Sequence, residues 1–262
     1  MNANAIVTKK LRLAYEEHTV VSHLDLKIPE GKVTSLIGPN GCGKSTILKA
    51  AGRIISPKGG SVLLDGSDIR TLPTREVAKR MSILPQAPVA PLGLTVRELV
   101  SYGRFPRRER FGRLNQEDQD IVTWALNVTQ LSKLEKAAVD TLSGGQRQRV
   151  WIAMAIAQQT DLILLDEPTT YLDMAYQLEV LELLEQMNHK QNCTIAMVLH
   201  DLNLASRFSD FLVAIRDGDI VAQGTPEEIM TPPVLRKTFH IDAEIARDPR
   251  TGRPACISYH LI

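Results

Sequence analysis

The run Gly-Pro-Asn-Gly-Cys-Gly-Lys-Ser at residues 38–45 constrains the fold of this chain more than any other stretch. It follows an apolar run at residues 32–37 that predicts a buried strand, and a helical pattern covers residues 47–54. The pattern G-x-x-x-x-G-K-S between a strand and a helix is typical of a loop whose backbone N–H groups bind phosphates. In such a loop Lys44 reaches the β and γ phosphates and the Ser45 hydroxyl ligates Mg²⁺. The run therefore predicts an α/β chain that binds a phosphate-bearing ligand.

Two adjacent acids end a second apolar run, at residues 161–167. Such runs are typical of parallel strands buried on both faces, and open α/β sheets bind ligands at the carboxyl ends of their strands. Asp166 is therefore placed to hold Mg²⁺ through water, and Glu167 to orient or deprotonate an attacking water. The alternative is that both acids only cap the strand, which the phosphate loop makes the weaker interpretation.

The sequence Leu-Ser-Gly-Gly-Gln at residues 142–146 opens a helical pattern that extends to residue 159. Ser143 and Gln146 have the spacing of a capping box, and the two glycines between them let a ligand approach the backbone closely. Free N–H groups and the positive end of the helix dipole favour an anion there. Taken alone, the stretch is better explained as an ordinary capped helix, and the phosphate loop upstream and the acidic strand downstream favour the anion site.

Three single residues are weaker candidates. Tyr15 ends a β-prone stretch, where its ring stacks on a purine or packs on the strand. Gln86 follows the strand predicted at residues 81–84, where it reaches a metal or a water, or is simply solvated. His200 follows the strand predicted at residues 193–199, where it contacts a γ-phosphate or has a structural role.

The remaining pattern divides the chain into lobes. Short alternating stretches over residues 5–28 predict antiparallel strands. Residues 88–140 predict a helical insertion, with a capping box at Thr95 and Glu98 and helices at 115–129 and 131–138. Within it, the basic and aromatic run at residues 104–111 is a nucleic-acid contact or a solvated, partner-facing loop, and we favour the loop. Residues 231–262 form a C-terminal extension without recognisable chemistry.

Net charge, cysteine spacing and hydrophobicity narrow the class of protein further. The net charge of the 262 residues is +1, so electrostatics gives no sign of a nucleic-acid partner. Cys42, Cys193 and Cys256 lack metal or disulfide spacing, which suits a reducing cytosol. The apolar run at residues 150–157 falls far short of the ~18 residues of a membrane span. We therefore expect a soluble intracellular chain.

Taken in order, these motifs resemble the ATP-binding subunits of ABC transporters over nearly the whole chain. The resemblance implies a P-loop NTPase core with an antiparallel β subdomain and a helical insertion, forming a single ATP-binding domain over residues 1–262. It implies ATP and Mg²⁺ as ligands, with Ser45, Gln86 and Asp166 at the metal and Glu167, His200 and Lys44 as catalytic residues. In the family, the residue at Gln86 also links Mg²⁺ to the membrane subunits, and the histidine at His200 senses the γ-phosphate. The implied nucleotide contacts are Tyr15, Gly38, Pro39, Asn40, Gly41, Cys42, Gly43, Lys44, Ser45, Thr46 and Gln86.

The same resemblance implies a homodimer. In this family the signature of one subunit closes on the ATP held by the phosphate loop of the other, and an aspartate further along communicates across the dimer. The residues implied to act in trans are Ser143, Gly144, Gly145, Gln146 and Asp173. The implied partners are a second copy, two membrane permease subunits and, indirectly, a substrate-binding protein, without nucleic acid. The implied location is the cytoplasmic face of the cell membrane, as a peripheral subunit.

A narrower likeness points to importers of iron–siderophore complexes, haem or vitamin B12. It is carried by Tyr-Gly-Arg at residues 102–104, Pro-Thr-Thr-Tyr-Leu-Asp at 168–173 and His-Asp-Leu-Asn at 200–203. The Thr-Tyr pair at 170 and 171 favours the siderophore branch, with a ferric citrate, hydroxamate or catecholate complex as cargo. The alternatives are a haem or vitamin B12 importer, or an Fe–S assembly ATPase of the same superfamily. A DNA-maintenance ATPase is disfavoured because residues 115–138 show no sustained heptads.

Overall fold

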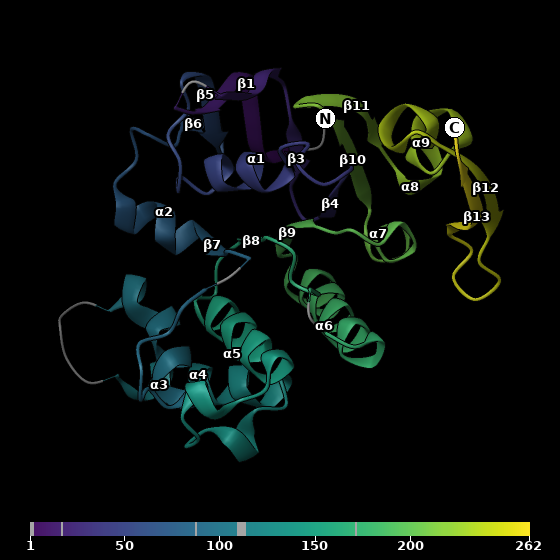
Figure 1. Ribbon diagram of the computed structural model, residues 1–262. Coiled ribbons are helices and arrows are strands. Elements are labelled where there is room, and N and C mark those ends of the chain that lie inside the picture. Colours follow the sequence, from purple (N-terminus) through teal and green to yellow (C-terminus); the bar gives the residue numbers. More distant parts are fainter. Residues whose placement is uncertain (1–2, 17, 87, 109–113, 171) are drawn as a thin grey trace.

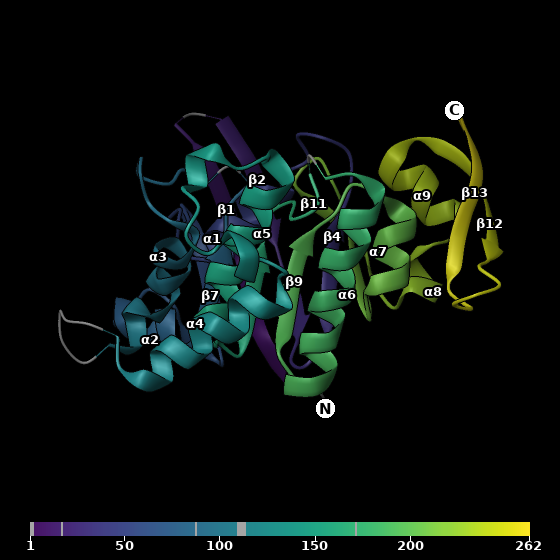
Figure 2. The ribbon, with the colours of Figure 1, turned by 90° about the horizontal axis from the view of Figure 1, so that it is seen from below.

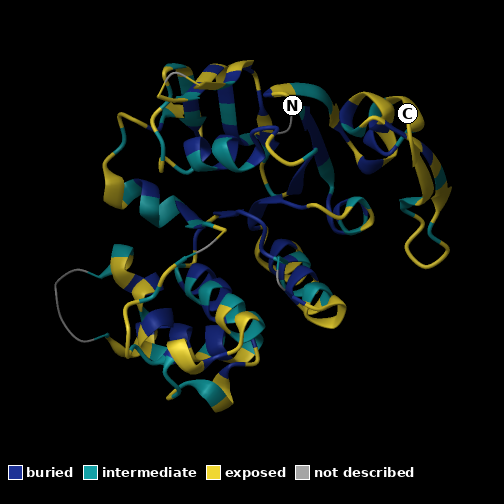
Figure 3. Ribbon diagram, viewed as in Figure 1, coloured by how far each residue is buried: buried dark blue, intermediate teal, exposed yellow. Residues whose placement is uncertain are grey.

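A six-stranded sheet forms the centre of the computed structural model, which describes residues 3–16, 18–86, 88–108, 114–170 and 172–262 (Figure 1). Five of its strands run parallel, and the edge strand pairs antiparallel with its neighbour. In spatial order the strands are β11 (Asp219–Gly224), β10 (Phe211–Arg216), β4 (Val33–Ile37), β9 (Thr194–Val198), β8 (Leu162–Leu165) and β7 (Met81–Leu84). Every residue of β4, β8 and β9 is buried, as expected for apolar strands covered on both faces (Figure 3).

A second, antiparallel sheet covers one side of this centre. Its path runs β2 (His18–Leu24), β1 (Asn4–Tyr15), β5 (Gly59–Leu64) and β6 (Ser67–Asp68), and β3 (Lys27–Pro29) also pairs with β1. Helix α1 (Lys44–Ala51) lies beneath β1 in Figure 1, and its apolar side chains share one core with both sheets. The predicted antiparallel β lobe is therefore confirmed, although β1 is one long strand with bulges rather than separate short ones.

Helices cover the opposite face of the central sheet and share a second core with it. They are α3 (Val96–Ser101), α4 (Gln116–Val128), α5 (Gly144–Ala157), α6 (Met174–Gln191) and α7 (Leu202–Phe208), and the 3-10 turn η1 (Tyr102–Arg107) follows α3. Helix α2 (Thr74–Arg80) instead places Val77 in the first core. The view from below places α5 and α6 in front of the central strands (Figure 2). Capping boxes open both α3 and α5, as their sequences predict.

The helix predicted at residues 131–138 is wrong. Only a 3-10 turn, η2 (Ser132–Leu134), forms there, and a second one, η3 (Val139–Thr141), follows. The carbonyls of Glu135 and Ala137 accept hydrogen bonds of 2.9 and 3.0 Å from the N–H groups of Arg97 and Val96. These two N–H groups belong to the first turn of α3 and lack partners within that helix. The segment thus caps α3 instead of forming a helix of its own.

The expectation of a solvated loop at residues 104–111 is also wrong at its first residue. Arg104 is 3% exposed, and its Nε donates to Asp118 of α4 over 2.8 Å. Its Nη1 donates to the carbonyl of Ala157 at the end of α5, also over 2.8 Å. Arg104 therefore joins η1, α4 and α5 from the inside, while residues 109–111 of the run lie outside the described residues.

The C-terminal extension folds as α8 (Pro226–Ile229), α9 (Pro232–Phe239) and a hairpin of β12 (Ile241–Arg247) and β13 (Pro254–Leu261). The hairpin forms its own two-stranded sheet at one end of the molecule (Figure 1). Asn203 of α7 fastens it there, since its side chain exchanges two hydrogen bonds with the backbone of Cys256. Within the described residues, every helix is too short or too polar to cross a membrane.

Candidate functional site

The loop between β4 and α1 is shaped by two glycines at which a side chain would be strained or would collide. Gly43 caps α1 with φ 101°, in the left-handed region that disfavours a side chain. At Gly38, with φ 155°, a Cβ would collide with the carbonyl oxygen of Ile215 on β10 and with the Cys42 sulfur. The loop therefore packs close against β10 while its first helical N–H groups remain free for a ligand.

Lys44 lies inside this loop. Its side chain is 4% exposed, and Nζ donates to the carbonyls of Gly38 and Pro39 over 2.8 and 2.9 Å. The Cys42 thiol is also buried, 3.8 Å from the same Nζ. Burial raises the pKa of Cys42, and the neighbouring Lys44 offsets only part of this effect. The loop thus holds a cation at its centre, and its two carbonyls fix that cation in place.

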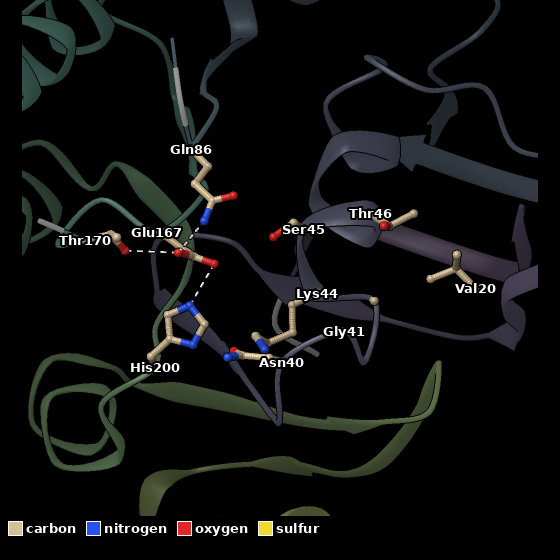
Figure 4. Close-up of a pocket in the computed structure, with 11 residues that line it drawn as sticks. Val20, Asn40, Gly41, Lys44, Ser45, Thr46, Gln86, Glu167, Thr170 and His200 are labelled. Carbon is tan, nitrogen blue, oxygen red and sulfur yellow. Dashed lines mark hydrogen bonds and ion pairs between the residues drawn. The ribbon is translucent and has the colours of Figure 1, made fainter. Parts of the chain in front are cut away.

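A pocket of about 560 Å³ opens between this loop and the carboxyl ends of β7, β8 and β9. Figure 4 shows the side chains that face it. The predicted site residues that line it are Asn40, Gly41, Gly43, Lys44, Ser45, Thr46, Gln86, Glu167 and His200. Two further residues, Val20 of β2 and Thr170, complete the lining. The phosphate loop and the acidic strand end therefore meet in one cavity.

Glu167 is held by donors from three separate loops (Figure 4). His200 Nε2 lies 2.7 Å from Oε1, while Gln86 Nε2 and Thr170 Oγ1 donate to Oε2 over 2.6 and 3.0 Å. Burial by itself would raise the pKa of Glu167, but the hydrogen bonds from His200, Thr170 and Gln86 outweigh it and hold the pKa below its usual range. The residue also has φ 54°, a strained value for a side chain with a Cβ. The structure thus presents an oriented, ionised carboxylate to the pocket.

The neighbouring acid, Asp166, lacks the hydrogen-bond donors that surround Glu167. It is 1% exposed, and neither carboxylate oxygen has a hydrogen-bond partner among the described residues. The nearest cation is Lys49, whose Nζ lies 3.9 Å from Oδ2. Burial raises the pKa of Asp166, and the nearby Ser45 and Lys49 counter this only in part. A buried acceptor of this kind requires a partner, and a cation or its bound water satisfies it.

Other predicted contacts lie outside the pocket lining. Tyr15 ends β1 with 48% of its side chain exposed, and Val20 on the adjacent strand faces the cavity instead. Gly38 and Pro39 contribute carbonyls to Lys44, as described above. The predicted stacking of Tyr15 on adenine therefore stays a prediction.

The residues predicted to act in trans are also absent from the lining of this pocket. Ser143 and Gln146 form the capping box of α5, with hydrogen bonds of 3.1 and 3.2 Å, and a Cβ on Gly144 would meet no atom within 4 Å. Asp173 is exposed and caps α6, where its carboxylate accepts from the N–H of Tyr176. Both helix starts thus present an open surface.

Sequence reasoning assigned no role to Val20 or Thr170. Val20 carries no signal, because an apolar strand residue has the same sequence pattern whether it faces a core or a ligand. Thr170 follows Glu167 by three residues, a spacing at which a hydroxyl in a turn reaches back along the chain. The three-residue spacing from Glu167 was therefore the sequence signal that could have predicted the role of Thr170.

Comparison with known proteins now identifies the class. The family model described as ABC transporter matches residues 21–170. The chain belongs to the ABC transporter family. The P-loop fold with its antiparallel β lobe, expected from the resemblance, is therefore confirmed.

The relatives place the chain more narrowly. It is 54% identical to the iron(3+)-hydroxamate import ATP-binding protein FhuC of Bacillus subtilis (strain 168), over 99% of this chain and 96% of that protein. It is 46% identical to the ferric enterobactin transport ATP-binding protein FepC of Escherichia coli (strain K12), over 95% and 92%.

Solved structures show the same architecture. A metal-chelate type ABC transporter in an inward-facing conformation matches with a TM-score of 0.82 and 28% identity, over 98% of this chain and 97% of that chain. A dimeric bacterial ABC transporter cassette matches with a TM-score of 0.76 and 29% identity, over 84% and 98%. A post-hydrolysis dimer bound to ADP and phosphate matches with a TM-score of 0.75, 28% identity and the same coverage.

Proposed function

We propose that this protein is the ATP-hydrolysing subunit of an importer that takes up an iron–siderophore complex. It acts at the cytoplasmic face of the cell membrane, as a homodimer bound to two permease subunits. A substrate-binding protein delivers the cargo to these permease subunits. The observation that carries the proposal is the meeting of the phosphate loop and the oriented Glu167 carboxylate in one pocket. The full-length similarity to siderophore import ATP-binding proteins supports the choice of cargo.

Binding of ATP begins at the phosphate loop. The free N–H groups at the start of α1 bind the phosphate oxygens, and the helix dipole adds to the attraction. Lys44 is buried in the same loop, so its charge acts on the β and γ phosphates at short range. Tyr15 and Val20, on adjacent strands of one hairpin, offer the base an aromatic and an apolar surface.

Asp166, Ser45 and Gln86 fit a magnesium site. Asp166 offers two buried oxygens without partners, while Ser45 and Gln86 line the pocket. Among the described residues, no cluster of three or more His, Cys, Asp or Glu side chains is arranged to hold a metal, so the phosphates and water would supply the remaining oxygen ligands. The ion would neutralise charge on the β and γ phosphates when bound.

Hydrolysis depends on Glu167. Its lowered pKa keeps the carboxylate ionised at neutral pH, so Glu167 can orient a water and accept its proton during attack on the γ-phosphate. His200 fixes the position of Oε1 and lines the pocket that would receive the γ-phosphate, while Gln86 and Thr170 fix Oε2. The carboxylate is thus oriented before the nucleotide arrives.

The working enzyme is a dimer. Ser143, Gly144 and Asp173 are exposed, Gly145 and Gln146 are half-buried, and none of the five lines the pocket of its own chain, which suits contact with ATP held by a second copy. The similarity to dimeric cassettes supports this arrangement. Each dimer then contains two shared ATP sites.

The proposal is tested in the cell that makes the protein. Deletion of the gene should abolish growth on a hydroxamate siderophore as the only iron source, and the wild-type gene should restore it, whereas Glu167→Gln should not. Uptake of ⁵⁵Fe-labelled ferric hydroxamate, catecholate, citrate and haem then separates the cargos. Normal growth and uptake of every ferric siderophore by the deletion strain would refute the assigned cargo.

A further inference from the structure

The chain after Glu167 runs along the first two turns of α5. Gln148 Nε2 donates to the carbonyl of Pro168 over 3.1 Å. Leu172 is buried, and its Cδ2 would lie 3.2 Å from a Cβ on Gly145, so a side chain there would press on it. Helices α5 and α6 are neighbours in both views (Figures 1 and 2). Helix α5, which begins with the signature at residues 143–146, therefore touches the segment at residues 168–176 at two places near the pocket.

A third contact lies one turn further along both helices. The Arg149 guanidinium lies over the ring of Tyr176, with Cζ 4.7 Å from the ring centroid. An arginine above an aromatic face is attracted by the negative charge of the π cloud. Arg149 Nε is buried and has no hydrogen-bond partner within the described part of the chain. Since an unpartnered donor is unfavourable, the stack and the surrounding packing must hold the side chain in this position.

The two members of the stack are spaced alike from the residues proposed to act in trans. Arg149 follows Gln146 by three positions on α5, and Tyr176 of α6 follows the N-cap residue Asp173 by three positions. Residues three apart lie on one face of a helix. Gln146 and Asp173 are, in addition, tied to these helix starts by their capping hydrogen bonds. The stack thus joins the two helix starts that carry the trans residues.

We propose that Arg149 is a positioning residue, which through its stack on Tyr176 fixes the spacing between the signature, residues 143–146, and Asp173. The role rests on the proposed function, because it concerns what one subunit presents to the ATP of the other. Arg149 does not line the pocket of its own chain. Its loss should therefore weaken closure of the dimer and leave binding of ATP to the separate subunit unchanged.

The test uses the full chain carrying Glu167→Gln, in which slow hydrolysis preserves ATP. Sedimentation equilibrium with ATP and Mg²⁺ measures the dimer Kd, and a fluorescent ATP analogue measures binding to the monomer. Adding Arg149→Ala or Tyr176→Leu should weaken dimerisation about tenfold, since each dimer loses two stacks. Tyr176→Phe is the matched control, because it keeps the aromatic face, and it should dimerise as the parent does. Binding of the analogue should stay within about twofold throughout.

The outcomes separate this inference from the proposed function. If Glu167→Gln alone does not dimerise with ATP, the shared-site mechanism is refuted and the positioning role with it. If it dimerises and Arg149→Ala does so equally well, only the positioning role is refuted. Weaker analogue binding in Arg149→Ala, or a loss from Tyr176→Phe as large as that from Tyr176→Leu, would also overturn it, because the residue would then act on its own site or through the hydroxyl.

Discussion

Nε2 of His200 lies 2.7 Å from Oε1 of Glu167, and this contact joins the ends of two neighbouring strands, β9 and β8. Gln86, at the end of β7, reaches the other oxygen of the same carboxylate. The Glu167 carboxylate is therefore fixed by side chains that the parallel sheet brings side by side, and not by its own loop alone.

Replacing Glu167 with glutamine should lower kcat by about 10²–10⁴-fold, because an amide cannot accept the proton of the attacking water. Binding of ATP should persist, since Lys44 and the loop N–H groups are unchanged. Phosphate release and binding of labelled ATP measure the two effects. Glu179→Gln, an exposed change on α6, is the control. Turnover at the wild-type rate would remove Glu167 from the mechanism.

Replacing Thr170 with valine should lower kcat about tenfold, because a hydrogen bond to a charged carboxylate is lost while the shape of the side chain is kept. Thr170→Ser retains the hydroxyl and should recover most of the rate. Steady-state ATPase assays compare kcat of the wild type with kcat of the valine and serine variants. Equal rates for the valine and serine variants would mean that the hydroxyl does not hold Glu167.

Replacing Asp166 with asparagine should have opposite effects on stability and activity. In EDTA the variant should be more stable than the wild type by about 1–2 kcal/mol, because burying a carboxylate without hydrogen-bond partners costs more than the 3.9 Å ion pair with Lys49 returns. Stabilisation by ATP and Mg²⁺ should fall, as should ATPase activity. Thermal unfolding with and without Mg²⁺ measures both. Asp161→Asn, an exposed change just before β8, is the control, and a variant with undiminished Mg²⁺ stabilisation would contradict the assigned site.

Cys193 should make stability fall at high pH. Burial raises the pKa of its thiol from 9.0 to about 12. The folded state therefore binds a proton that the unfolded chain loses, so the contribution to stability is complete below pH 9 and is lost as pH rises toward 12. At pH 10.5 the loss is about 2 kcal/mol relative to pH 8. Urea unfolding of the wild type and of Cys193→Ala at both pH values checks this, and parallel curves would refute it.

Removing Arg104 should destabilise the protein by about 3–5 kcal/mol, because Asp118 would keep a buried charge without its partner. Removing Asp118 as well, in the double variant with alanine at both positions, should recover part of this loss. Urea unfolding of the two single variants and the double variant completes the cycle. Additive losses would show that the two charges do not stabilise each other.

The sequence predicted β4, β7, β8 and β9 of the central sheet and the phosphate loop because these depend on local pattern. Apolar runs such as residues 161–165 can be buried only in a covered sheet, and the glycines at 38 and 43 are required by the loop backbone itself. The capping boxes at Thr95 and Ser143 were likewise local and are confirmed.

The features that the sequence did not predict depend on contacts between distant parts of the chain. Residues 131–138 have a helical pattern, yet their carbonyls bond to the start of α3, a demand that only the folded chain creates. Arg104 looks like a surface residue until Asp118 and the end of α5 are brought to it. The convergence of Gln86, Thr170 and His200 on Glu167 depends on strand order in the sheet, which no single motif encodes.

The position and the pKa of the Glu167 carboxylate depend on three donors that belong to different parts of the chain. Gln86 stands at the entry to the helical region, Thr170 lies in the segment that touches α5, and His200 leads into α7. A displacement of any one of these parts removes a donor and raises the pKa of Glu167 toward its usual value. We therefore expect the rate of hydrolysis to fall when the helical region, the segment that touches α5 or the turn into α7 is displaced from Glu167.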